Sequence, residues 1–399
     1  MTENKLQVYR SEVENELKRI LGYWSRFTSD AGSGGFFGRI DEDNNADTTA
    51  PKGSVLNSRI LWTFSAAYNQ IRNKEYREIA SRAFLYFFEY FIDRDYGGVF
   101  WTVDYLGQPL DAKKQVYALA FAIYGLSEYS KFDETGEAIA QAIELFRRLE
   151  KSAFDKERAG YIEAFSRDWK ALGDLRLSAK DANEKKTMNT HLHILEAYTN
   201  LYRVWPDKVL KEKIILLISN FSRHIVNAGT SHLILFFDED WNKRSATISF
   251  GHDIEASWLL YEAAITIGDE SLIGKTQELS LKLSTAVLEG LDKDGGLWYE
   301  KEGDHLIVEK HWWPQAEAMV GFYNAWELSG DLAFLEHSIN SWVFIKNHLL
   351  DKKHGEWFWG VNSDYSPMKG QDKVGLWKCP YHNGRACLEI MKRIHQLQK

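Results

Sequence analysis

Histidines recur near the starts of apolar segments that have helical periodicity. His193 lies in the first turns of one such segment, His252 opens another, and His382 lies near the start of the last one. An imidazole has an unperturbed pKa of about 6.5, so it can accept or donate a proton at neutral pH. Two histidines that face each other across a pocket can take a proton from one face of a carbon and return a proton to the other face. This chemistry inverts a carbon next to a carbonyl group.

Other side chains at the starts of these segments suit the same chemistry. Arg59 can stabilise the oxygen of the enediolate that forms when such a carbon loses its proton. His191 lies two residues before His193, and on a helix such neighbours point to roughly opposite sides, so the two do not suit one metal ion. No HExxH motif or cysteine pair accompanies them, and we therefore predict no metal. Further candidates at comparable positions are Tyr117, Asn189, Trp313 and Trp377.

Carboxylates lie one helical turn from two of the histidines. Glu196 follows His193 by three residues, and Glu255 follows His252 by three, so each pair shares a helix face. Each carboxylate is placed to orient its imidazole or to bind a hydroxyl group. A glycoside hydrolase would instead need two carboxylates flanking the scissile bond, and Glu255 keeps that alternative open.

The last predicted helix repeats this spacing with a cation. Arg385 follows His382 by three residues and Glu389 follows it by seven, which again places the three side chains on one face. For Glu389 a simple salt link within the helix is an equally good interpretation.

The segments that carry these residues belong to a regular series of twelve predicted helices. Helices that are apolar around most of their circumference, as buried helices are, alternate with helices that are charged on one face. The apolar kind begins near residues 54, 113, 188, 253, 312 and 380. The twelve predicted ranges are 4–26, 54–73, 75–92, 113–130, 133–150, 188–204, 207–226, 253–267, 269–289, 312–329, 331–349 and 380–397.

A short β-like segment, usually begun by glycine, separates each charged helix from the next apolar one. Gly97-Gly-Val-Phe-Trp and Gly295-Gly-Leu-Trp are two of six such segments. Repetition of one unit implies that each unit buries its face on its neighbours. We therefore predict an all-α fold, an (α/α)6 barrel of twelve helices with short β-hairpin-like segments in the loops. An open solenoid is the alternative, but neither end shows a polar capping repeat.

The same pattern predicts where the functional residues gather. In such a barrel all inner helices start at one end, and the long loops before them meet there, so we expect the site at that end. Proline is scarce, with six residues, and no Pro/Gly/Ser-rich linker interrupts the chain. We therefore expect residues 1–399 to form a single catalytic domain.

Composition excludes several classes of protein. The 399 residues are 44% hydrophobic and carry a net charge of −8 without a Lys/Arg run, which argues against nucleic acid as a partner. The longest apolar stretch, near 118–126, is too short for a membrane span, and no signal-peptide pattern precedes it. With two cysteines there is no disulfide framework, so we expect a cytoplasmic protein. A closed barrel of this size can be stable alone, so we expect a monomer. The 15 tryptophans suit either sugar stacking or a large aromatic core.

Four segments carry a resemblance to a known family: 56–62, 186–202, 251–260 and 377–385. They contain Arg59, the His191-Leu-His193 sequence, His252 and the Trp377-Lys-Cys-Pro-Tyr-His382 sequence. In these segments, and from about residue 8 to about residue 395, the sequence resembles the cellobiose 2-epimerases, within the N-acylglucosamine 2-epimerase superfamily. The resemblance implies the same barrel and a reaction that needs neither metal nor cofactor.

The resemblance also implies the reaction. The reducing-end glucose of β-1,4-linked disaccharides would be epimerised at C2, so that cellobiose gives glucosyl-mannose and lactose gives epilactose; disaccharides of the mannobiose type would also be substrates. His252 and His382 are implied as the two acid/base residues on either side of a cis-enediolate. His193 would assist opening of the sugar ring, and Arg59 would bind near the C1 and C2 oxygens.

Substrate-binding positions follow from the same resemblance. Asn189 and Glu255 would bind sugar hydroxyls or orient the histidines, and Trp313 and Trp377 would pack against the reducing-end sugar. Ser178, Asp181 and Trp298 would hold the non-reducing sugar, and we add Tyr117 as a binding residue at the same end of the barrel. The alternatives are an N-acylglucosamine 2-epimerase or mannose isomerase, an (α/α)6 glycoside hydrolase that uses Asp253, Glu255 or Glu317, and a sugar-binding solenoid without catalysis.

Overall fold

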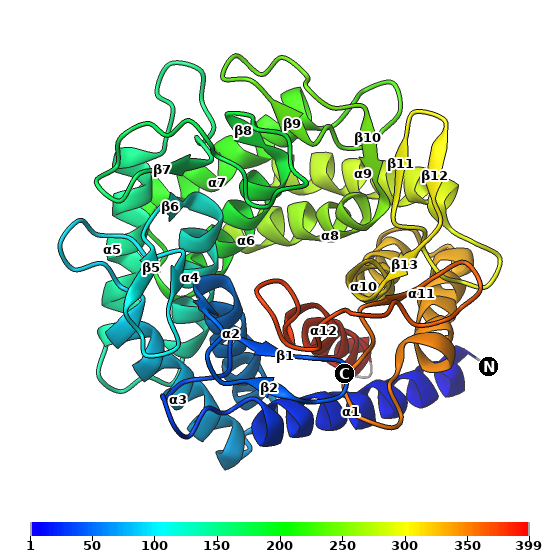
Figure 1. Cartoon of the computed structure of the whole chain (residues 1–399). Helices are drawn as coiled ribbons and strands as arrows, with labels where there is room; N and C mark the ends of the chain where they lie inside the picture. The colour runs from blue at the N-terminus through cyan, green and yellow to red at the C-terminus, as the bar shows by residue number, and fades with distance from the viewer. Residues whose placement is uncertain (1, 398–399) are drawn as a thin grey trace.

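Residues 2–397, the part of the chain that the structure describes, form twelve α-helices in two concentric rings in the computed structural model (Figure 1). The predicted (α/α)6 barrel is therefore confirmed. The inner ring consists of α2 (Ser54–Ile71), α4 (Val116–Tyr129), α6 (Met188–Val204), α8 (Phe250–Ile267), α10 (Trp312–Ser329) and α12 (Tyr381–Leu397). The outer ring consists of α1 (Thr2–Phe27), α3 (Lys74–Tyr90), α5 (Glu137–Ser152), α7 (Lys208–Asn220), α9 (Glu270–Ala286) and α11 (Leu332–Phe344).

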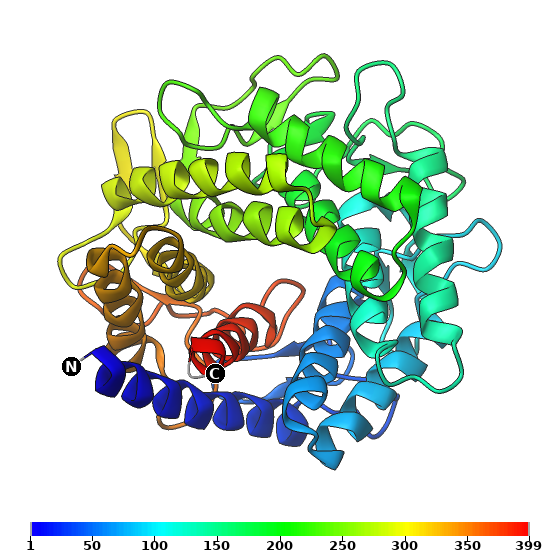
Figure 2. The same ribbon diagram turned by 180° about the vertical axis from the view of Figure 1, so that it is seen from behind.

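The two ends of the chain close the barrel together. Each inner helix packs against the next, and α12 packs back against α2, which completes the inner ring. The first helix, α1, packs along α12 as its outer partner (Figure 2). The sixth helical hairpin is thus built from the two ends of the chain, so the ring has no open end of the kind a solenoid has.

Side-chain composition separates inner from outer helices. All 14 residues of α4 are buried, because its neighbours cover it on every side. The outer helix α5 buries only one stripe, which includes Ala142, Leu145 and Leu149, and its other faces are charged. The final turns of α7 and α11 continue as π-helical turns over Phe221–Ile225 and Ile345–Leu349, and α9 continues as a 3-10 turn over Val287–Gly290. The predicted helix ends therefore differ from the observed ones by a few residues.

Among the helices of residues 2–397, none combines the length and the apolar composition that crossing a membrane requires.

Each outer helix ends in the same tight turn. In the first repeat the Asp30 N–H donates to the carbonyl of Gly35, and the Gly34 N–H donates to the carbonyl of Asp30. Gly34 and Gly35 both have positive φ, of 81° and 61°, which glycine adopts without a Cβ clash. This turn explains why the β-like segments begin with glycine. Equivalent turns begin at Asp93, Asp155, Asn227, Asp292 and Asp351.

The short strands mostly pair between neighbouring repeats rather than within one hairpin. The strand before an inner helix pairs with the strand that follows the next turn, as β3 pairs with β4 through Lys52 and Val103. The bridge between Ile40 and Val374 closes this ring of pairs. The strands are β1 (Arg39–Ile40), β2 (Ala46–Asp47), β3 (Lys52–Gly53), β4 (Thr102–Val103), β5 (Pro109–Asp111), β6 (Lys114–Gln115), β7 (Ala164–Phe165), β8 (Lys186–Thr187), β9 (Phe236–Phe237), β10 (Thr247–Ser249), β11 (Glu300–Glu302), β12 (His305–Ile307), β13 (Lys310–His311) and β14 (Gly360–Val361).

In five of the six repeats of the described chain, a buried lysine–aspartate pair, which we call the latch, ties the turn to the segment before the next inner helix. In the first repeat Lys52 Nζ lies 2.8 Å from Asp30 Oδ2 and donates to the Gly34 carbonyl at 2.7 Å. The latch lysines are between 0% and 4% exposed. In the described part of the chain the other latches are Lys114–Asp93, Lys186–Asp155, Lys310–Asp292 and Lys373–Asp351.

The fourth repeat lacks both charges of the latch. Asn227 takes the place of the aspartate and still accepts hydrogen bonds from Gly229 and Thr230 within the turn. Ile248 takes the place of the lysine, since it occupies the same strand position before α8 that Lys52 occupies before α2. The joint loss agrees with the high cost of an unpaired buried charge.

The fourth repeat suggests a test of the latch. Asp30→Asn leaves the Lys52 ammonium buried without its carboxylate and should lower the free energy of unfolding by about 3–5 kcal/mol. The double variant Asp30→Asn/Lys52→Ile copies the fourth repeat and should recover most of that loss. Urea unfolding measures both, and Glu278→Gln, in an exposed pair with Lys282, serves as control with a change below about 0.5 kcal/mol. A double variant no more stable than the single one would contradict this account.

Candidate active site

The first turns of the inner helices bring most of the predicted site residues together. Trp313 of α10 contacts two of the histidines, with ring centroids 4.7 Å from His252 of α8 and 5.6 Å from His382 of α12. On the other side Tyr117 of α4 lies 5.0 Å from the ring of His193 of α6. The structure thus groups three histidines from three repeats at the end of the barrel where the inner helices start.

These side chains occupy equivalent positions of the repeats. Lys52 has a counterpart in the strand before each of the inner helices α4, α6, α8 and α10. The residue seven positions after Lys52 or a counterpart is Arg59, His193, Glu255 or Glu317 (52 and 59, 186 and 193, 248 and 255, 310 and 317). The residue three positions after such a counterpart is Tyr117, Asn189 or Trp313 (114 and 117, 186 and 189, 310 and 313). Positions four apart share a helix face, so the repeats present one common face to the site.

A buried arginine joins carboxylates from three inner helices. Arg385 Nη2 lies 2.5 Å from Glu255 Oε1 of α8 and 2.6 Å from Glu317 Oε1 of α10, and Nη1 bonds to Glu196 of α6. The Tyr381 hydroxyl bonds to the same Glu196 carboxylate. Arg385 and its three partners are each no more than 2% exposed. At that depth the ion pairs are strong and screening by salt is weak.

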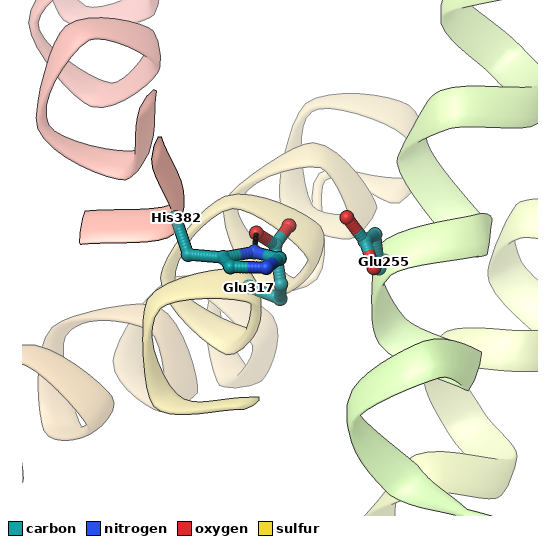
Figure 3. Close-up of side chains that lie close together, drawn as sticks. All are labelled: Glu255, Glu317 and His382. Carbon is teal, nitrogen blue, oxygen red and sulfur yellow. Dashed lines mark hydrogen bonds and ion pairs between the residues drawn. The ribbon is translucent and has the colours of Figure 1, made fainter. Parts of the chain in front are cut away.

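The cluster fixes the protonation pattern of His382. Figure 3 shows His382, Glu317 and Glu255 converging from α12, α10 and α8. His382 Nδ1 lies 2.7 Å from Glu317 Oε1. Because the carboxylate paired with Arg385 only accepts hydrogen bonds, Nδ1 carries the proton and donates it. The other nitrogen, Nε2, then holds the lone pair of a base.

The spacing of His193 and Glu196 predicts their contact correctly, whereas the similar spacing of His252 and Glu255 does not. His193 Nδ1 lies 2.9 Å from Glu196 Oε2, so this imidazole is oriented as His382 is. Glu255 instead bonds to Arg385, and His252 Nδ1 lies 2.8 Å from the hydroxyl of Ser249. The arginine competes for the Glu255 carboxyl group with a hydrogen bond from a charged donor, which is stronger than a bond from a neutral imidazole.

Burial keeps the three histidines neutral. It lowers the pKa of His382 well below its ordinary value, helped by the positive charges of Arg59 and Arg385. Burial also lowers the pKa of His193, and it lowers that of His252 to about 3. At neutral pH each imidazole therefore has one lone pair and one N–H, as an acid/base residue needs.

Glu255 behaves in the opposite way. Burial, reinforced by the negative charge of Glu317, raises its pKa to about 8. At neutral pH this carboxyl is therefore mostly protonated, although Arg385 is close. Its second oxygen, Oε2, is buried without a hydrogen-bond partner among the described residues, so it is free to bind a hydroxyl group.

Arg59 lies in an aromatic cage on the neighbouring helices. Its guanidinium is 4.1 Å from the centre of the Phe121 ring and 4.8 Å from that of Tyr381. Nη2 donates to the Tyr117 hydroxyl at 2.7 Å, and Nη1 lies 3.9 Å from Cys379 Sγ. The cage fixes a permanent positive charge close enough to His382 to lower the pKa of that histidine.

The remaining predicted binding residues lie in the loops and first helical turns at this end of the barrel. Trp377 contacts the rings of Trp101 and Tyr117, with centroids 5.9 Å and 6.0 Å away. Asn189 is half-buried in the first turn of α6, and its Oδ1 lacks a hydrogen-bond partner among the described residues. Both side chains belong to the group around His193.

Ser178 and Asp181 form one turn of the loop before α6. The Ser178 N–H donates to Asp181 Oδ2 at 2.8 Å. The carboxylate of Asp181 lies near Tyr299 and Glu300 and contributes to the raised pKa of both. This places the turn opposite the strands that lead into α10.

The structure places Trp298 differently from its neighbour Tyr299. The Trp298 indole bonds to Asp292, and its ring packs on the apolar cluster that contains Phe250 and Leu297. Tyr299 reaches Trp313, with ring centroids 6.5 Å apart. The structure therefore does not bring Trp298 into the group around the histidines.

His191 is a structural residue, although it lies two residues from His193. Its Nδ1 lies 2.7 Å from the carbonyl of Thr187, and its Nε2 accepts the backbone N–H of Tyr161 at 2.9 Å. Both ring nitrogens are therefore occupied, and the ring packs 5.0 Å from that of Trp241. The opposite directions expected for the two histidines are confirmed.

Three of the buried side chains have the composition of a metal site. One ligand atom each from Glu255, Glu317 and His382 lie within 4.8 Å of one another. The Arg385 guanidinium, however, already bonds to both carboxylates and supplies the positive charge that a metal ion would bring. The donor set therefore does not suit an additional dication.

Sequence reasoning missed the part of Glu317 and Tyr381 in this site. The sequence suggests Glu317 only as a carboxylate of a hydrolase, yet it orients His382 from another helix. The signal was present in the repeats, since Glu317 occupies the position equivalent to His193 and Arg59. Glu389, in contrast, forms the simple links within α12, to Lys392 and Arg393.

Known proteins resemble this chain over nearly its whole length. A family model described as N-acylglucosamine 2-epimerase (GlcNAc 2-epimerase) matches residues 35–386. Cellobiose 2-epimerase of Bacteroides fragilis is 50% identical over 388 residues, 96% of this chain and 99% of that protein. The structure of cellobiose 2-epimerase from Bacillus thermoamylovorans B4167 is similar with a TM-score of 0.93 at 39% identity, covering 97% of this chain and 100% of the other. N-acylglucosamine 2-epimerase of Mus musculus is more distant, at 24% identity over 98% of this chain and 92% of that protein.

The depressed pKa of His191 predicts a pH dependence of stability. Burial lowers this pKa to about 4, whereas the unfolded chain titrates near the ordinary value of 6.5. Between these values the unfolded state binds a proton that the folded state does not, so stability falls as the pH falls. In His191→Gln, the slope of unfolding free energy between about pH 7 and pH 5 should be smaller than in the wild type by about 1 kcal/mol per pH unit. Urea titrations at several pH values measure it.

The control for this experiment is the exposed His305. The variant His305→Gln should retain the wild-type slope, because its side chain is solvated in the folded protein. A His191→Gln slope equal to that of the wild type would contradict the assignment.

The arginine-filled cluster predicts the absence of a metal site at this position. Calorimetric titration with Mn²⁺ should show no saturable one-to-one binding, because the Arg385 guanidinium repels a dication from Glu255 and Glu317. One-to-one binding that disappears in Glu255→Gln would disprove this interpretation, whereas binding that survives the substitution would place the ion elsewhere.

Proposed function

The chain belongs to the N-acylglucosamine 2-epimerase family, and on that basis we propose that it epimerises C2 of the reducing-end glucose of β-1,4-linked disaccharides. It is an enzyme of the isomerase class, a carbohydrate epimerase. Cellobiose would give glucosyl-mannose. The 50% sequence identity of this chain to a cellobiose 2-epimerase supports this choice of substrate.

The observation that carries the proposal is the pair of neutral histidines that contact Trp313. His382 and His252 come from different inner helices, and the Trp313 ring contacts both. Epimerisation needs one base and one acid on opposite faces of the same carbon. Two imidazoles with depressed pKa values meet that need at neutral pH, because neither is locked in the charged form.

The reaction begins with opening of the sugar ring. His193, whose Nδ1 is held by Glu196, presents Nε2 to the hemiacetal hydroxyl and takes its proton. The ring C–O bond then breaks, and the protonated His193 gives its proton to the ring oxygen, which leaves the open-chain aldehyde and a neutral imidazole. Asn189 and the protonated Glu255 are placed to bind the neighbouring hydroxyl groups.

The C2 proton then moves to His382. Its Nε2 lone pair takes the proton, while the electron pair of the C–H bond moves into an enediolate over C1 and C2. The fixed charge of Arg59 stabilises the oxygen anion. Rotation about the C2–C3 bond exposes the other face, and His252 gives its Nε2 proton to C2, which leaves the opposite configuration. The proton that His382 took from C2 then replaces, by exchange through solvent, the proton that His252 gave up, so both imidazoles return to the neutral form. Protonation at C1 instead would give a ketose as side product.

The loops supply the specificity for a second sugar in this proposal. Trp377 and Trp313 offer aromatic faces for the reducing-end sugar, since sugar C–H faces stack on such rings. The turn of Ser178 and Asp181 would bind the non-reducing sugar, and Tyr299 extends the aromatic surface in that direction more directly than Trp298 does. Lactose and disaccharides of the mannobiose type would use the same contacts.

The site argues against a glycoside hydrolase. That reaction needs two carboxyl groups that flank the bond, one to donate and one to attack or activate water. Here Glu255 and Glu317 both bond to Arg385, and Asp253 is engaged by His232 at 2.7 Å. A mannose isomerase or an N-acylglucosamine 2-epimerase would share the histidines, so these alternatives depend on the loops alone.

The proposal also covers the compartment, the oligomeric state, the domain organisation and the absence of a cofactor. The two cysteines are free, buried thiols, which suits a reducing cytoplasm. The ring of inner helices closes without a partner chain, so the protein would act as a monomer, with one catalytic domain over the whole chain and no cofactor.

Proton NMR of cellobiose with the enzyme in D2O tests the proposal. The wild type should place deuterium at C2 of the reducing sugar and form glucosyl-mannose, without added metal or nucleotide. His382→Asn and His252→Asn should each lower epimer formation by about a thousand-fold, since each removes an acid/base group. Starting from cellobiose, His252→Asn should retain exchange at C2 through His382, whereas His382→Asn should not.

The outcomes separate the alternatives. Epimer formation at the wild-type rate in either variant rules out the two-histidine scheme. Release of free glucose would indicate a hydrolase, and an unchanged spectrum with cellobiose but exchange with mannose or N-acetylmannosamine would move the substrate to a monosaccharide.

A further inference from the structure

Ser249 is the last residue before α8 and the only polar contact of His252 that the described residues provide. Its side chain is completely buried, and its Oγ lies 2.8 Å from His252 Nδ1. Since His252 acts as an acid/base residue only in the proposed epimerase, the role we derive for Ser249 rests on that proposed function.

The position of Ser249 normally serves the helix rather than a side chain. A serine at the N-cap usually accepts a backbone N–H of the first turn. Thr187 does so at the equivalent position of α6, through the N–H of Thr190, and Asp331 does so at the start of α11. Ser249 occupies the N-cap of α8 without such a bond. Its hydroxyl forms a hydrogen bond with His252 instead of with a backbone N–H of the helix.

The hydroxyl of Ser249 is the donor in this hydrogen bond. In the described part of the chain, its Oγ has no other partner, so His252 Nδ1 is the acceptor available to the hydroxyl hydrogen. The reverse arrangement, with Nδ1–H as donor, would leave that hydrogen buried without an acceptor, which is costly. The neutral imidazole of His252 therefore carries its proton on Nε2.

This tautomer is the opposite of that found at the other two histidines. His382 and His193 donate from Nδ1 to carboxylates and keep a lone pair on Nε2. We propose that Ser249, hydrogen-bonded to His252 Nδ1 from the N-cap of α8, is a positioning residue that holds His252 as a resting proton donor opposite the base His382. One hydroxyl in place of a carboxylate thus distinguishes acid from base.

Tight packing holds the ring in the orientation that this bond requires. A Cβ on Gly251 would lie 2.5 Å from the Trp313 ring, so only glycine lets α8 approach Trp313 so closely. The same Trp313 ring contacts His252 at a centroid distance of 4.7 Å. The imidazole therefore cannot turn over to exchange its two nitrogens without displacing Trp313.

Nitrogen-15 NMR of the substrate-free enzyme tests the tautomer directly. The His252 signals are assigned by their loss in His252→Asn. In the wild type at neutral pH, Nδ1 of His252 should have the chemical shift of an unprotonated ring nitrogen and Nε2 that of a protonated one. In Ser249→Ala, a substantial fraction of the opposite tautomer should appear. A wild-type Nδ1 that carries the proton would overturn the proposal.

Kinetics and stability supply the second readout. Ser249→Ala should lower kcat for epimerisation by about ten-fold and change KM little, because one hydrogen bond to the acid is lost. Its unfolding midpoint should stay close to that of the wild type, since no helix cap is removed. The matched control Asp331→Ala, a true N-cap far from the histidines, should lower the midpoint and leave kcat unchanged. Unchanged kcat and unchanged NMR shifts in Ser249→Ala would refute the assignment.

The experiment separates this inference from the proposed function. The tautomer is measured without substrate, so it is confirmed or refuted even if cellobiose is not converted. A correct tautomer in an enzyme that fails to epimerise any disaccharide would refute the proposed substrate and leave the pairing of Ser249 with His252 intact.

Discussion

The guanidinium of Arg385 is shared by carboxylates from three inner helices, and the geometry of the site depends on this contact. Glu196 and Glu317 would repel one another at this depth, since burial makes charge repulsion strong, and burial together with the charge of Glu317 keeps Glu255 mostly protonated. Arg385 turns that repulsion into attraction and draws α6, α8 and α10 toward α12. Two of the carboxylates then use their remaining capacity to orient His193 and His382. One buried cation therefore sets both the spacing of four helices and the direction of two imidazoles.

The repeats explain how residues so far apart in the chain reach one place. Each inner helix is preceded by a strand that pairs with the next repeat, and in most repeats a latch lysine anchors that strand. The start of each inner helix is thus fixed before its first turn. Positions three and seven residues beyond Lys52 and its counterparts Lys114, Lys186, Ile248 and Lys310 lie in the first turns of α2, α4, α6, α8 and α10. Function required only that polar side chains occupy these positions in some repeats, while Phe121 and others fill them in the rest.

The sequence predicts the barrel well because the signals for its helices are local. Apolar spacing identifies twelve helices, and their alternation separates the inner from the outer ring. The strand pairs between repeats cannot be predicted in this way, since a strand of two residues has no periodicity of its own. The same holds for the latches, although Asp30 and Lys52 have counterparts in the other repeats, because a pair of charges about 20 residues apart is no local pattern.

The site is predictable in part for the same reason. Contacts within one helix, such as that of His193 with Glu196, follow from spacing alone. Contacts between helices do not follow from spacing. Examples are the partner of His382, which comes from α10, and the partner of Glu255, which comes from α12. The arginine also explains why His382 remains a base. A carboxylate beside a histidine favours the protonated imidazole and so raises its pKa. Burial lowers the pKa of His382, and the charges of Arg59 and Arg385 lower it further, so the Glu317 carboxylate orients the ring without protonating it.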